Sequence, residues 1–160
     1  MLLLINKPVY PLYLWFLAPS ALLPSLLTML SMPAYWLIAR LAKRAPDLAR
    51  KGLVLAGLLD TVAISFVLGQ ASGAEFFLFA CMLLASLCFY RDETLASRLS
   101  VVAIFCVFAV LHGRYGSGLG QIMPDDAANL FKLNLLGAAA LIAFMALRFP
   151  RSARRPRVRS

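Results

Sequence analysis

Long apolar stretches separated by short charged segments make up most of the chain. No charged residue occurs at positions 8–39, and at about 1.5 Å per residue this stretch is longer than the roughly 30 Å hydrocarbon layer of a bilayer. Trp15 and Trp36 are spaced like two interfacial aromatic belts. The pattern predicts one membrane span over residues 14–37. Three prolines leave a tight helical hairpin open as the alternative: Pro19, Pro24 and Pro33.

Four further apolar stretches follow, and each is bounded by a polar or charged break. A short polar break at 70–73, a charged turn at 91–98 and a glycine-rich loop at 113–126 separate them. Asp125 and Asp126 favour a helix start after that loop, because acidic side chains stabilise a helix N-terminus. We therefore predict an all-α transmembrane bundle over residues 1–149 and a basic tail over 150–160, with five spans, or six with the hairpin. The four later spans are expected at 52–69, 74–90, 99–112 and 127–149.

Composition excludes an ordinary soluble domain. Of 160 residues, 62% are hydrophobic and 14% charged, against about 45–50% and about 25% in soluble proteins. A chain of this length leaves no room for a separate catalytic domain beside the bundle. The three cysteines lie inside apolar stretches and are expected to be buried hydrophobes without a disulfide or zinc site: Cys81, Cys88 and Cys106.

The positive charges cluster at the edges of the apolar stretches. This placement sets membrane orientation and attracts anionic lipids, and it argues against nucleic-acid binding despite the net charge of +9. With five spans, the positive-inside rule places the C-terminus in the cytoplasm and the N-terminus outside, and a hairpin would move only Lys7. The residues expected inside are Arg40, Lys43, Arg44, Arg50, Lys51, Arg91, Arg98, Arg148, Arg151, Arg154, Arg155, Arg157 and Arg159.

Polar residues within the apolar stretches are the candidate site residues, since an ionisable group at bilayer depth costs roughly 2.5–3.5 kcal/mol. Asp60 is either a structural group that joins two helices or a ligand or proton site. Lys132 either extends to the membrane surface or pairs with Glu75 in a polar pocket under the glycine-rich loop. His112, the single histidine, is an interfacial residue or a pH or ligand sensor.

Catalytic constellations are missing from the sequence. It contains no Ser-His-Asp arrangement, no paired carboxylates and no metal-ligand cluster. We therefore expect a non-enzymatic protein without a cofactor or a metal.

From Arg50 onward the order of features resembles a known family. The residues that carry the likeness are Ala49-Arg50-Lys51, Asp60, the stretch 68–77 with Gly73 and Glu75, Tyr90-Arg91-Asp92-Glu93, and the stretch 133–138 with Asn134. They resemble the six-helix membrane modules of bacterial nucleotide cyclases and sensor histidine kinases, including quorum-sensing receptor kinases. The resemblance implies a bundle that transmits an external or lipid-borne cue, with an outer site near Gly73, Glu75 and Asn134. Because no effector domain follows residue 149, it also implies a separate signalling partner.

These observations predict a sensor-like or interaction subunit of a signalling assembly in the bacterial inner membrane. The alternative is a small transporter or channel component that works as an oligomer, with Asp60 facing a wet path. The tail is expected to bind anionic lipids or a cytoplasmic partner through Arg151, Arg154, Arg155, Arg157 and Arg159. The candidate ligand-binding residues are Asp60, Gly73, Glu75, His112, Lys132 and Asn134.

Overall fold

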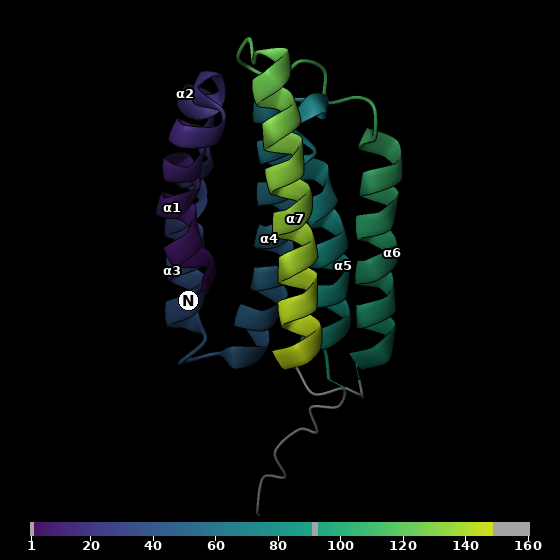
Figure 1. Cartoon of the computed structure of the whole chain (residues 1–160). Coiled ribbons are helices and arrows are strands. Elements are labelled where there is room, and N and C mark those ends of the chain that lie inside the picture. Colours follow the sequence, from purple (N-terminus) through teal and green to yellow (C-terminus); the bar gives the residue numbers. More distant parts are fainter. Residues whose placement is uncertain (1, 91–92, 149–160) are drawn as a thin grey trace, which may run out of the picture.

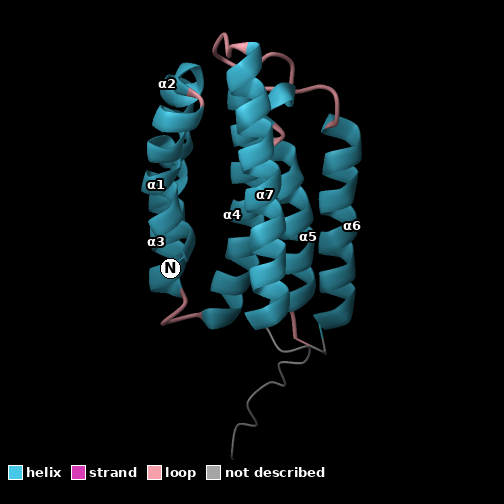
Figure 2. Ribbon diagram, viewed as in Figure 1, coloured by secondary structure: helices cyan, strands magenta, loops and turns pink. Residues whose placement is uncertain are grey.

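The computed structural model describes residues 2–90 and 93–148, and within them every regular element is helical (Figure 2). This confirms the predicted all-α bundle. The longer elements are α1 (Leu2–Leu17), α2 (Leu22–Leu26), α3 (Met32–Leu41), α4 (Pro46–Leu68), α5 (Phe77–Cys88), α6 (Thr94–Leu111) and α7 (Pro124–Arg148). Short 3-10 turns lie between some of them: η1 (Pro19–Ala21), η2 (Leu27–Ser31), η3 (Gln70–Ser72) and η4 (Ala74–Phe76).

The first apolar stretch folds as a hairpin, so the predicted single span over 14–37 is wrong and the alternative is correct. Helix α1 runs along the bundle in one direction, and α2, η2 and α3 return beside it (Figure 1). The reversal occurs at Ala18, whose φ of −153° and ψ of 69° leave the helical region. A residue before proline is pushed out of the α conformation, and Pro19 follows directly. Pro33 lies in the first turn of α3, where a proline is tolerated.

Helices α4 and α7 begin where proline and acidic residues favour a helix start. Each has a proline as its first residue and an acidic residue in its first turn, Asp47 in α4 and Asp125 and Asp126 in α7. Helix α4 therefore starts at Pro46, earlier than the predicted position 52. The helix start favoured by Asp125 and Asp126 is confirmed, with α7 beginning at Pro124, a few residues before the expected span start at 127.

Four helical segments are long and apolar enough to cross a membrane: Pro19–Leu41, Pro46–Leu68, Thr94–Leu111 and Pro124–Arg148. Helix α5 is shorter, with 12 residues, or about 18 Å at the usual rise. Helix α6 lies at the edge of the bundle (Figure 1). Cys106 of α6 is exposed, contrary to the expected burial, because much of the apolar surface of this helix faces away from its neighbours. All three cysteines are free thiols.

The two ends of the bundle differ in charge. At the basic end lie the α3–α4 turn, the α5–α6 turn and the end of α7, and at the loop end lie η3, η4 and the segment 112–123 (Figure 1). The hairpin brings Leu2 to the same end of the bundle as Arg148, so the five-span prediction, which put the residues before the first span at the opposite end, is wrong on this point. The described cations of the basic end are Arg40, Lys43, Arg44, Arg50, Lys51, Arg98 and Arg148.

The bundle interior is built from small and branched apolar side chains. One cluster joins Leu14, Leu68 and Leu130 from α1, α4 and α7, which ties the hairpin to the rest of the bundle. Many large apolar side chains point outward, including both tryptophans of the chain, Trp15 at 65% and Trp36 at 50% exposure. Outward apolar surface on this scale is what lipid-facing helices require.

Candidate functional site

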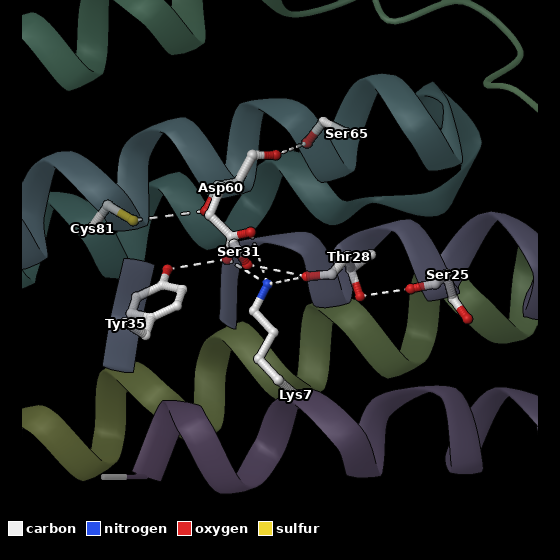
Figure 3. Close-up of polar contacts among 9 residues, drawn as sticks. Lys7, Ser25, Thr28, Ser31, Tyr35, Asp60, Ser65 and Cys81 are labelled. Atoms are coloured by element: carbon white, nitrogen blue, oxygen red, sulfur yellow. Dashed lines mark hydrogen bonds and ion pairs between the residues drawn. The ribbon is translucent and has the colours of Figure 1, made fainter. Parts of the chain in front are cut away.

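Asp60 of α4 forms an ion pair with Lys7 of α1 inside the bundle (Figure 3). The Lys7 Nζ atom lies 2.7 Å from Asp60 Oδ1 and 2.6 Å from Oδ2, and the two side chains are only 10% and 12% exposed. Lys7 also donates to the Thr28 carbonyl oxygen at 2.9 Å, and the Tyr35 hydroxyl donates to Asp60 Oδ2 at 3.0 Å. Lys7 and Asp60 are called the central pair below. Their contacts join both helical arms of the hairpin, α1 and the returning segment α2–α3, to α4.

The central pair shows what the sequence interpretation missed. The five-span prediction counts Lys7 only as a cation on the outer side and gives it no partner, yet the residue is only 9% exposed. A lone charge at bilayer depth is costly, and an opposite charge with good hydrogen bonds offsets that cost. The usable signal was one lysine directly before the first apolar stretch and one aspartate within the next. The single-span interpretation hid it, because only the hairpin brings Lys7 alongside α4.

Glu75 is the most buried acidic side chain among the described residues and lies at the loop end, with 2% of the residue exposed. Its Oε1 atom accepts a hydrogen bond from Gln70 Nε2 and lies 3.1 Å from His112 Nδ1. The His112 side chain is 56% exposed, so the pair reaches from the interior to the surface. Glu75 Oε2 is buried without a partner in the described part of the chain. A buried carboxylate with one free oxygen is a functional candidate, because such atoms are normally hydrogen-bonded.

Asn134 of α7 links this region to the hairpin. Its Nδ2 atom donates to the Ser72 carbonyl oxygen and its Oδ1 atom accepts from the Tyr10 hydroxyl, both at 2.9 Å. The residue is 1% exposed. Both ends of a buried amide are thus satisfied, and η3, α7 and α1 are held together by one side chain. The loop-end cluster is defined here as Gln70, Ser72, Glu75, His112 and Asn134.

Two of the predicted site residues take other positions. Gly73 has a φ of 66°, and a Cβ atom there would lie 2.8 Å from the Phe131 ring, so this residue allows the turn to pack on α7. Lys132 is exposed and has no carboxylate partner in the described segments. Of the two alternatives for Lys132, the pairing with Glu75 does not form, because His112 contacts Glu75 instead, and the exposed side chain agrees with extension to the surface. Lys132 is two residues from the buried Asn134, and residues at that spacing do not share a helix face.

The glycine-rich loop packs across the end of α4, with its backbone in direct contact with the backbone of that helix end. Gln70 N donates to the Gly116 carbonyl oxygen and Leu119 N donates to that of Val67, both at 2.9 Å. A Cβ atom on Gly118 would lie 2.7 Å from the Gly69 nitrogen, closer than real Cβ atoms approach. The crossing therefore requires glycine. A hollow of about 420 Å³ lies beside it, between the α4 end, the loop and the first turn of α7.

Tyr115, in the same loop, is buried beside the cluster. Burial is the main cause that raises the pKa of its phenol, and the nearby Glu75 carboxylate adds to the increase. Its hydroxyl has no hydrogen-bond partner by geometry within the described residues. Glu75 Oε2 and the Tyr115 hydroxyl are thus two buried oxygens with free hydrogen-bonding capacity in one region.

At the basic end, Arg50 holds three helix ends together. Its guanidinium lies 3.7 Å from the centre of the Tyr90 ring, donates to the Cys88 carbonyl oxygen, and pairs with Asp47 at 2.6 Å. Glu93, which precedes α6, lies 3.8 Å from the same guanidinium. These contacts connect the start of α4 to the α5–α6 turn.

Glu93 gives a pH prediction for this end. A hydrogen bond from Lys51 and another from the Tyr90 N–H lower the pKa of the Glu93 carboxyl below its usual value of 4.5. A lowered pKa means that the ionised carboxylate adds stability above the unfolded-state pKa, and that this gain is lost as the pH falls through the folded-state pKa. We expect thermal melts in detergent to show weaker acid sensitivity below about pH 4.5 for Glu93→Gln than for the wild type. Equal acid sensitivity would contradict this role.

The described residues contain no group of three or more His, Cys, Asp or Glu side chains that could hold a metal ion. The tail arginines proposed to bind lipid, Arg151, Arg154, Arg155, Arg157 and Arg159, lie outside the described residues. No family model, no curated protein and no solved structure matches the chain. Function must therefore be argued from the geometry of the two polar clusters.

Proposed function

We propose that the chain is a non-enzymatic, sensor-like subunit of a membrane signalling assembly, and that it receives its signal at the loop-end cluster. The observation that carries the proposal is the Glu75–His112 pair. It joins a carboxylate buried in the bundle to an imidazole in contact with the surroundings. A group in this position can exchange a proton or a small ligand with solvent while remaining packed against the helices.

The contacts around the cluster supply a route to the rest of the bundle. The carbonyl oxygen of Ser72, three residues before Glu75, accepts a hydrogen bond from the Asn134 side chain. The same side chain accepts a hydrogen bond from the Tyr10 hydroxyl of α1. Tyr10 lies about one helical turn from Lys7, which binds Asp60. A change at the α4–α5 turn would thus act on the hairpin through consecutive hydrogen bonds, and the hairpin is the element we expect to respond.

The charge of the Glu75–His112 pair depends on pH. The ion pair exists only while the imidazole carries a proton and the carboxylate does not, and imidazole is the side chain that normally changes charge between pH 5 and 8. Its ionisable neighbour is Tyr115, whose raised pKa keeps the phenol neutral in this range. Loss of the imidazole proton would remove the ionic attraction and loosen the contact between segment 112–123 and the α4–α5 turn.

Hydrogen exchange of the full chain in nanodiscs tests this proposal. After correction for intrinsic rates, exchange in segment 112–123 should rise by up to roughly fivefold from pH 5.5 to pH 8, because a half-exposed pair is worth at most about 1 kcal/mol. His112→Asn should remove the pH dependence, and since the chain has one histidine no other imidazole can replace it. Arg114→Gln, a neighbouring exposed cation, is the matched control. Unchanged pH dependence in His112→Asn would refute the proposal.

The subunit role requires a partner, and a second copy of the chain is one candidate. Copurification of a kinase, a cyclase or another signalling protein from native membranes would support it. Copurification of a transport subunit would favour a transporter component instead.

The central pair argues against the transporter alternative, because both Asp60 oxygens are engaged by Lys7 and one also accepts a hydrogen bond from Tyr35. Such an Asp60 is a structural group that joins helices.

The charge difference between the ends supports an orientation with the basic end in the cytoplasm of a bacterial inner membrane. Because Leu2 and Arg148 both lie at that end of the bundle, this orientation places both of them at the cytoplasmic side. The arginines of the tail would then face the same anionic leaflet as the helix-connecting turns.

A further inference from the structure

The cations at the end of α3, in the α3–α4 turn and at the start of α4 fall into two groups. Lys51 lies 3.0 Å from Glu93, and Arg50 is paired with Asp47, so two of them are neutralised. Arg40, Lys43 and Arg44 are exposed and have no carboxylate partner among residues 2–90 and 93–148. These three residues are called the cationic turn below.

The cationic turn lies at the end of α3. Arg40 is in the last turn of α3, Trp36 precedes it by one helical turn, and Lys43 and Arg44 follow in the turn after the helix. The Arg40 guanidinium lies 3.8 Å from the centre of the Trp36 ring, which holds it in place without neutralising it. Backbone hydrogen bonds from Lys43 N to Arg40 O and from Arg44 N to Leu41 O keep the turn compact.

The surroundings place these charges where a lipid headgroup lies. Trp36 and Leu37 are 50% and 61% exposed on the outside of α3, so the helix meets the lipid directly up to the turn. A tryptophan at this level marks the membrane–water interface, and cations one turn further along reach the phosphate level. Arginine and lysine bind phosphate oxygens through charge-assisted hydrogen bonds.

We propose that the cationic turn is a binding site for the phosphate of an anionic phospholipid in the leaflet around the basic end. The acyl chains would lie along Trp36 and Leu37, and the headgroup would contact Arg40, Lys43 and Arg44. This site is separate from the loop-end cluster and does not depend on the sensor role proposed above.

Lipid titration of the detergent-purified full chain, followed by native mass spectrometry, tests the site. Phosphatidylglycerol should bind the wild type more tightly than phosphatidylcholine. Lys43→Gln with Arg44→Gln should weaken phosphatidylglycerol binding roughly 25-fold, from a roughly fivefold contribution per cation near an anionic headgroup. The matched control is Arg98→Gln with Arg148→Gln, which removes two exposed cations from the same end but leaves the turn intact.

The control variant should retain binding to within roughly threefold, since its arginines lie on other helices. Equal losses in the two double variants would overturn the proposal in favour of diffuse attraction. The proposal would also be overturned if replacing the tail arginines 154, 155 and 157 by glutamine abolished phosphatidylglycerol binding while Lys43→Gln with Arg44→Gln retained it. Inorganic phosphate that displaces phosphatidylglycerol at low millimolar concentration would point to a soluble ligand and would also overturn it.

Discussion

Replacing Lys7 by methionine should destabilise the folded protein by about 3–5 kcal/mol, the largest effect that we expect from a single substitution. The change leaves the Asp60 carboxylate inside the bundle without its counter-charge, and breaking a buried ion pair from one side carries a cost of this size. Unfolding in mixed micelles with increasing denaturing detergent would measure the free-energy difference. Asp60→Leu alone, which leaves the Lys7 ammonium unpaired, should have a similar effect.

The double variant Lys7→Met with Asp60→Leu is the decisive control. Because it removes both charges, it should recover most of the lost stability, as apolar replacements of buried ion pairs often do. A residual cost of about 1 kcal/mol is expected, since the Tyr35 hydroxyl loses its acceptor. If the costs of the two single variants simply add in the double variant, the two side chains are not coupled and the pair is not what holds the hairpin.

Gly118→Ala should be the next most damaging change. The residue has a φ of 81°, and an added Cβ atom would lie 2.7 Å from backbone atoms of Leu68 and Gly69. The left-handed backbone costs roughly 1–2 kcal/mol for a residue with a Cβ atom, and forcing apart packed groups adds typically about 1–3 kcal/mol. We expect a total loss of roughly 2–5 kcal/mol in the same unfolding assay.

Gly116→Ala separates these two contributions. Its φ is 64°, but nothing lies within 4 Å of the position that its Cβ atom would occupy. It should therefore lose only the roughly 1–2 kcal/mol of backbone strain. Equal losses at positions 116 and 118 would show that the loop does not need close backbone contact with α4.

Much of the architecture could be predicted from the sequence because lipid imposes simple requirements. Apolar length, proline and acidic helix starts and the clustering of cations predicted α4 to α7 and the basic end. The cost of a polar side chain at bilayer depth identified Asp60 and Glu75 as candidates, whereas Asn134 was a candidate through the family resemblance. These inferences rest on local pattern, which a single sequence provides.

What could not be predicted depended on which helices are neighbours. The partner of Asp60 lies 53 positions away, and that of Asn134 on α1 lies 124 positions away. Such pairs can be assigned only once it is known which helices are neighbours. Here that depended on whether the first apolar stretch forms one span or a hairpin. For Lys132, helix periodicity alone could have decided between the two alternatives, because it places this residue away from the helix face that carries Asn134.

The position of the two tryptophans has a practical consequence. Trp15 belongs to α1 and Trp36 to α3, and both are exposed on the hairpin. The tryptophan fluorescence of this protein, excited selectively over that of tyrosine, therefore originates from the hairpin alone. Quenching by brominated lipids would report how deeply the hairpin is immersed, without a label and without interference from the other helices.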